Sequence, residues 1–112
     1  MDAILHVLLV DGARAMTEPE LQHAIAHIIT THLGHAPNVR IFLFGSRATG
    51  QHTPRSDYDI GIDATAPIPL AMLGRIQADL DELPVLPKIE VVDLHRVGET
   101  FRQAALASAK AW

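Results

Sequence analysis

The chain contains no cysteine and only one tryptophan, and each shortage removes a class of function. Without cysteine, its 112 residues form neither disulfides nor thiolate metal sites, which agrees with a reducing cytoplasm. A single tryptophan, Trp112, does not make a surface that stacks nucleic-acid bases. The formal net charge of -4 also argues against a basic surface that coats nucleic acid. We therefore expect a cytoplasmic protein with no direct nucleic-acid binding.

Long apolar runs are also missing. A bilayer span needs about 20 apolar residues, and no segment of the sequence approaches that length. The first ten residues are apolar, but Asp2, His6 and the lack of a basic start make them a poor signal peptide. We therefore expect no membrane association. Residues 1–15, whose spacing suits either a helix or a strand, are interpreted as an N-terminal extension, and residues 16–112 as one domain.

The clearest helix signal begins at Thr17. Thr17 and Glu20 have the spacing of a capping box, in which each side chain accepts a hydrogen bond from the backbone of the other residue. Gly34 is a natural helix stop. The apolar residues between them share one helical face: Leu21, Ala24, Ile25, Ile28, Ile29 and Leu33. This pattern predicts a helix over residues 18–33.

Strands and helices alternate further along the chain. Strands are predicted over residues 39–44, 58–63 and 88–94, and helices over residues 70–83 and about 99–112. The inward faces of these helices are expected to consist of Leu70, Leu73, Ile76, Leu80 and Leu83, and of Phe101, Ala105, Ala109 and Trp112. This order predicts an α+β fold, in which a small mixed sheet carries helices packed on one face.

Two aspartates, Asp57 and Asp59, stand one residue apart at the start of the second predicted strand. Residues i and i+2 of a strand project to the same face, so both carboxylates can offer oxygen ligands to one or two Mg²⁺ ions. Such pairs are also common at the starts of ordinary surface strands. The pair therefore needs support from other parts of the sequence.

Gly45 and Ser46 follow the first predicted strand directly, and Ser46 opens a short helical turn. Glycine lets a ligand approach the backbone, and the start of a helix offers N–H groups to phosphate oxygens. Arg47 and Arg55 lie in the same loop. They are candidate contacts for a triphosphate, with ordinary solvated loop charges as an equal alternative.

A third acid stands in the middle of the last predicted strand. Glu90 lies between Ile89 and Val91, where a carboxylate is out of place unless it has a partner or a chemical role. Asp93 is the rival candidate. It lies three residues further along and points to the opposite face, so only one of the two can join the aspartate pair.

These segments together resemble the minimal nucleotidyltransferases (MNT) of the DNA polymerase β-like nucleotidyltransferase superfamily. The family pattern is Gly-Ser after a strand, D-x-D on the next strand, and a lone acid between apolar residues on a later strand. Gly45-Ser46, Asp57-Tyr58-Asp59 and Ile89-Glu90-Val91 supply these parts in order. The resemblance covers roughly residues 16–112 and implies a two-layer, polymerase β palm-like fold.

The resemblance also implies roles for the site residues. Gly45 and Ser46 would bind nucleotide phosphates, with Arg47 and Arg55 as helpers on the triphosphate. The catalytic and metal-binding set would consist of Asp57, Asp59 and Glu90, holding two Mg²⁺ ions.

By the same resemblance, the chain would transfer AMP from ATP to a tyrosine hydroxyl of a small helical HEPN toxin and so act as its antitoxin. The alternative is a catalytically weak or inactive subunit that neutralises its partner by contact alone. The nucleoside triphosphate and the HEPN protein are the expected partners. Whether the chain forms homo- or hetero-oligomers stays open.

Overall fold

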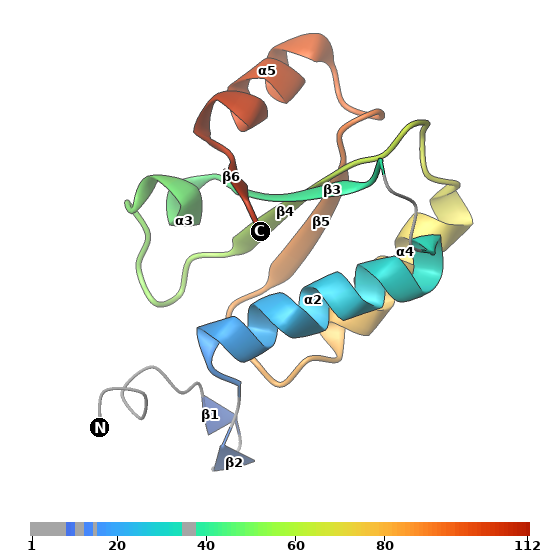
Figure 1. Ribbon diagram of the computed structural model, residues 1–112. Coiled ribbons are helices and arrows are strands. Elements are labelled where there is room, and N and C mark those ends of the chain that lie inside the picture. The colour runs from blue at the N-terminus through green and yellow to red at the C-terminus, as the bar shows by residue number, and fades with distance from the viewer. Residues whose placement is uncertain (1–8, 11–12, 15, 35–37) are drawn as a thin grey trace.

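The computed structural model describes residues 9–10, 13–14, 16–34 and 38–112 (Figure 1). The order of its elements is β1 (Leu9–Val10), β2 (Ala13–Arg14), α2 (Glu18–Leu33), β3 (Arg40–Phe44), α3 (Ser46–Thr49), β4 (Tyr58–Asp63), α4 (Leu70–Asp81), β5 (Ile89–Asp93), α5 (Glu99–Ser108) and β6 (Lys110–Ala111). The predicted strands and helices are all present. Among the helices described, none is both long and apolar enough to span a bilayer.

Four strands form the main sheet, in the order β5-β4-β3-β6. Strand β4 is antiparallel to β3 and parallel to β5, and β6 is antiparallel to β3. The sheet is therefore mixed, as the sequence predicts. The parallel pair β4 and β5 is joined by α4, the helical crossover that two parallel neighbours require.

Helices α2 and α4 cover one face of the sheet (Figure 1). The capping box forms at the start of α2, where the Glu20 amide donates to Thr17 Oγ1 at 3.3 Å and the Thr17 amide donates to Glu20 Oε1 at 2.8 Å. The core beneath the two helices is continuous and includes the fully buried residues Leu21, Ile25, Ile29, Ile60, Ile62 and Ile76. Each such side chain contributes about 1.5–3 kcal/mol by leaving water.

Helix α5 lies over the other face of the sheet, on the far side from α2 and α4 (Figure 1). There Ala105 packs with Phe44 and Leu94 in a second, smaller apolar cluster. The pleat explains both layers, because successive strand residues point to opposite faces. The fold class is confirmed, and the helices of the larger core share one face as expected, while α5 adds a cover to the second face.

The last predicted helix ends earlier than expected. Residues 99–108 are helical, but Lys110 and Ala111 form β6, which pairs with Leu43 and Phe42 of β3. The unpaired edge of β3 offers backbone partners that a helical continuation could not use. Two expected inward residues are also exposed: Leu70 at 66% and Phe101 at 47%. Leu70 is the first residue of α4, whereas Phe101, although partly exposed, meets the Phe44 ring of the smaller cluster edge-on, with the ring centroids 6.0 Å apart.

Candidate functional site

Gly45 marks the point where β3 gives way to the short helix α3. Its φ of 75° lies in the left-handed region, which favours glycine. A Cβ atom at this position would lie 2.4 Å from Asp59 Oδ2, well inside van der Waals contact. Both observations require glycine here. The backbone of Gly45 thus comes directly against one of the two predicted metal-binding carboxylates.

Ser46 is the first residue of α3 and is half-buried. The start of a helix leaves its leading N–H groups without acceptors inside the helix. The Gly45 carbonyl accepts from the amides of Ala48 and Thr49 at 3.0 and 3.3 Å, which closes this tight turn. The predicted short helical turn after β3 is therefore present, beside Asp59.

Strand register brings Asp59 and Glu90 together. In β4 and β5, which run parallel, Asp59 pairs with Glu90, and on its other side Asp59 pairs with Phe44 of β3. Paired residues of neighbouring strands project to the same face. Burial first, and then the charges of Asp57 and Glu90, raise the pKa of the Asp59 carboxyl above its ordinary value. Asp59 thus lies close enough to the other two carboxylates to be repelled by both.

Asp93 lies away from this group. It is 2% exposed and sits on the face of β5 opposite to Glu90. Its Oδ2 accepts from the Ile68 amide at 2.7 Å, and its Oδ1 accepts from the His95 amide at 2.9 Å. Asp93 thus holds two loops in place, whereas Glu90 is exposed on the side of the sheet where Asp59 lies.

The donor set at Asp57 and Asp59 fits a magnesium ion that a nucleotide helps to bind. Mg²⁺ is usually held by one or two carboxylates together with substrate phosphates and water. Within the described part of the chain, no three or more acidic or histidine side chains are already grouped as metal ligands. Two aspartates could supply part of the coordination of Mg²⁺, and the phosphates of a nucleotide lying near the Gly45 backbone could supply the rest. Glu90 as a third metal ligand stays a prediction.

Arg47 and Arg55, the two predicted triphosphate contacts, differ in their surroundings. The Arg47 guanidinium donates to the Ser56 carbonyl at 2.9 Å and to the Thr53 and Pro54 carbonyls at 3.3 Å. It also lies 3.9 Å from the centre of the Tyr58 ring. Arg55 is exposed in the loop between α3 and β4. The structure thus assigns Arg47 to the loop itself and leaves Arg55 in solvent.

Tyr58, between the two aspartates, is a neighbour of the site that sequence reasoning missed. Its ring points to the opposite face, is 3% exposed and stacks on Trp112 at 5.8 Å. Its hydroxyl donates to Glu18 Oε2 at 3.1 Å. Burial and the Glu18 carboxylate raise the pKa of Tyr58 to about 12, so the ring is neutral at pH 7. The one sequence feature that could have drawn attention to Tyr58 is its position between the two aspartates of the D-x-D motif.

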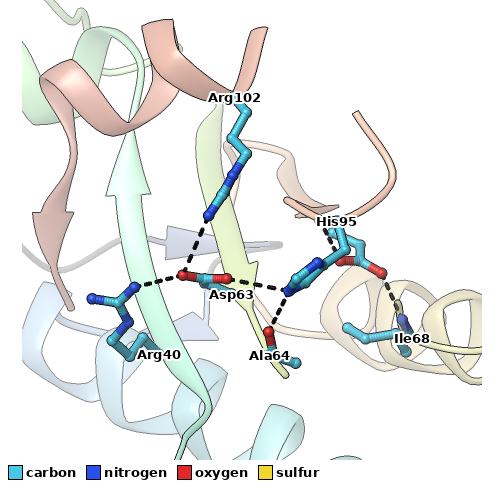
Figure 2. A network of polar contacts seen from close by, with 7 residues as sticks. Arg40, Asp63, Ala64, Ile68, His95 and Arg102 are labelled. Atoms are coloured by element: carbon cyan, nitrogen blue, oxygen red, sulfur yellow. Dashed lines mark hydrogen bonds and ion pairs between the residues drawn. The ribbon is translucent and has the colours of Figure 1, made fainter. Parts of the chain in front are cut away.

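A second polar cluster lies at the other end of β4, around Asp63 (Figure 2). Arg40 Nη2 lies 2.6 Å from Asp63 Oδ2, and Arg102 Nη2 lies 3.9 Å from the same oxygen. His95 Nε2 lies 3.5 Å from Asp63 Oδ1 and contacts the Ala64 carbonyl. These contacts join β3, β4 and α5. No sequence pattern indicates this cluster, because its members are far apart along the chain.

Comparison with solved structures shows which fold this is. A minimal nucleotidyltransferase is 23% identical, covers 85% of this chain and 95% of its own, and has a TM-score of 0.62. A toxin–antitoxin structure with AMP-PNP is 24% identical, covers 77% and 71%, and has a TM-score of 0.53. A tri-AMPylated Shewanella oneidensis HEPN toxin in complex with an MNT antitoxin is 21% identical, covers 82% and 71%, and has a TM-score of 0.50.

Comparison with curated proteins found no match. The family described as polymerase beta, nucleotidyltransferase matches residues 26–111, which include both Gly45-Ser46 and the whole of the four-stranded sheet. That span is most of the chain, and the solved structures share its small mixed sheet with covering helices. The chain therefore belongs to the polymerase beta nucleotidyltransferase family.

Proposed function

We propose that the chain is a Mg²⁺-dependent nucleotidyltransferase that transfers AMP from ATP to a tyrosine hydroxyl of a HEPN toxin, and that it acts as the antitoxin of that partner. The observation that carries the proposal is the position of Asp59. This residue lies against the Gly45 backbone on one side and in register with Glu90 on the other. A glycine turn suited to phosphate and a group of carboxylates without an ion pair among the described residues meet at Asp59.

Similar structures support the choice of nucleotide and acceptor. One structure of this fold is a toxin–antitoxin with AMP-PNP, an ATP analogue, and another contains a tri-AMPylated HEPN toxin bound to an MNT antitoxin.

In the proposed reaction, the tyrosine oxygen attacks the α-phosphorus of ATP. The new O–P bond forms as the bond from the α-phosphorus to the bridging oxygen breaks, and pyrophosphate leaves with the bonding electrons. The hydroxyl proton passes to the Glu90 carboxylate, which lies beside Asp59. Gly45 and Ser46 orient the phosphates through the turn at the start of α3. Arg55 is a candidate contact for the departing pyrophosphate.

Asp57 and Asp59 would hold Mg²⁺, which supplies stabilisation of negative charge on the attacking and leaving oxygens. Without a cation to neutralise them, the negative carboxylates of Asp57 and Asp59 would repel the negative phosphates of the nucleotide. This requirement makes transfer dependent on a divalent cation.

The decisive experiment follows the α-phosphate. The chain is incubated with Mg²⁺, ATP and a candidate HEPN partner, once with label in the α-phosphate and once in the γ-phosphate. We expect α-label on the partner and no γ-label, and loss of α-label with Asp57→Ala and Asp59→Ala. Glu82→Ala, an exposed acid at the end of α4, is the matched control.

Three outcomes have distinct meanings. Label from the γ-phosphate would mean phosphoryl transfer and would contradict the proposal. No label from either position, with the partner still bound and inactive, would favour the alternative of neutralisation by contact. Label that disappears when the partner's tyrosines are replaced by phenylalanine would identify the acceptor.

A further inference from the structure

The loop between α3 and β4 carries Asp57, and among the described residues it is the Arg47 side chain that fastens this loop from outside it. Within the loop, the Thr53 amide donates to Ser56 Oγ at 2.9 Å and the Ser56 amide donates to the Thr53 carbonyl at 3.0 Å. These bonds make a compact turn but do not connect it to the sheet. The Arg47 guanidinium makes that connection through three loop carbonyls, those of Thr53, Pro54 and Ser56.

The same guanidinium lies on an aromatic ring that is itself fixed. Arg47 Cζ lies 3.9 Å from the centre of the Tyr58 ring, a distance at which cation and ring attract one another. The Tyr58 ring is held by Trp112 at 5.8 Å and by the hydrogen bond to Glu18. Arg47 is therefore anchored on a buried residue that stands between Asp57 and Asp59 in the chain.

We propose that Arg47 is a positioning residue, whose planar guanidinium fastens the Thr53–Ser56 turn to the Tyr58 ring and so fixes Asp57 relative to Asp59. Its N–H groups face loop carbonyls, which distinguishes it from a direct ligand of the triphosphate. A lysine offers one ammonium point charge and no planar fork, so it cannot make the same set of contacts. This inference rests on the proposed function, since it concerns where the two metal-binding aspartates lie.

Amide hydrogen exchange followed by NMR tests the inference in the free protein. Arg47→Lys and Arg47→Met are compared with Arg75→Lys, an exposed arginine on α4. Tyr58→Phe keeps the ring under Arg47 but removes the bond to Glu18. Thermal melting of each variant verifies that it folds.

We expect both Arg47 variants to accelerate exchange of the Thr53 and Ser56 amides by about tenfold or more, because the turn opens more often. Arg75→Lys and Tyr58→Phe should leave these amides protected. In the transfer assay, both Arg47 variants should lower kcat by about tenfold or more, while the KM for ATP changes less than about threefold.

Two results would overturn the inference. One is unchanged exchange of the Thr53 and Ser56 amides in both Arg47 variants. The other is a kcat retained by Arg47→Lys together with a raised KM for ATP in Arg47→Met, the behaviour of a phosphate ligand. If the wild-type chain transfers no nucleotide, the proposed function fails, and the exchange rates alone then support or overturn the role of Arg47 in holding the loop.

Discussion

Strand β4 carries two aspartates on the same face whose surroundings are opposite. Asp59, near its start, lies beside Asp57 and Glu90, and no basic side chain of the described residues lies within ion-pair distance of it. Asp63, roughly 13 Å further along, lies among Arg40, Arg102 and His95 (Figure 2). One end of the strand collects negative charge and the other neutralises it.

The difference separates a carboxylate whose charge is compensated within the fold from one that is proposed to bind a ligand. At Asp63, nearby cations compensate a carboxylate that is 7% exposed, as a buried charge requires. At Asp59, the neighbouring charges have the same sign, and the pKa of its carboxyl is raised. Repulsion of this kind costs stability in the free protein and is relieved by a bound cation.

Asp59→Asn should have the largest effect on activity. The change removes one of the two carboxylates proposed to bind Mg²⁺, so the proposed AMP transfer should fall on the order of 10²–10³-fold or more. Thermal stability should stay equal or rise slightly, because the variant also removes repulsion from Asp57 and Glu90. Transfer rates and melting curves measure the two effects. A variant that melts well below wild type would show that Asp59 stabilises the fold, as Asp63 does.

Gly45→Ala should be next. The added methyl group would lie 2.4 Å from Asp59 Oδ2, and the alanine would be strained at the φ of 75° that the backbone has at this position. We expect transfer to fall by about 100-fold, because small misplacements at a reacting centre are costly. The matched control is Gly50→Ala, which has a similar φ of 81° but nothing within 4 Å of its added Cβ. Equal losses of transfer in both variants would mean that backbone strain, rather than contact with Asp59, is responsible.

Glu90→Gln should reduce transfer by about 10–100-fold, because the proposed proton acceptor is lost while its shape is kept. The side chain is exposed, so the melting temperature should change little. Asp93→Asn is the informative counterpart. It should lower the melting temperature, because Asp93 is buried and holds Ile68 and His95, while transfer by the folded fraction is retained. The reverse result would make Asp93 the third acid.

Asp63→Asn should have the smallest effect on transfer and a clear effect on stability. Removing the charge leaves Arg40 and Arg102 without their shared carboxylate, which should cost about 1–3 kcal/mol after allowance for the solvent exposure of both arginines. Urea unfolding measures this loss, and transfer per folded molecule should stay within about threefold of wild type. A large loss of transfer without a loss of stability would show that Asp63, like Asp59, serves the reaction rather than the fold.

Periodicity was sufficient for much of the fold. The capping box and apolar stripe place α2 as predicted, and the alternation of the strand residues puts Tyr58 in the core on the face opposite to Asp59. Strand β6 escaped prediction because its two residues become a strand only by pairing with the free edge of β3. Such pairing is a property of the assembled sheet and leaves no local pattern in the sequence.

For the candidate site, the sequence indicates which residues to consider but not how they are arranged in space. Residue type and spacing identify the aspartates, but only strand register shows that Glu90 lies opposite Asp59 and that Asp93 does not. Arg47 illustrates the limit most clearly. A positive charge beside Gly-Ser suggests a phosphate contact, and the three carbonyls that surround it belong to a loop whose path is set by tertiary contacts.

The strand order β5-β4-β3-β6 has a consequence for how a protein acceptor would reach the site. Strand β5 is an outer strand, so Glu90 lies at the border of the sheet, while Asp59 lies one strand further in. An acceptor side chain that approaches across β5 would meet Glu90, the proposed proton acceptor, before it meets the two aspartates proposed to bind Mg²⁺. If the acceptor is a tyrosine on the surface of a folded partner, a site near the edge of the sheet can be reached by that side chain without the partner having to unfold.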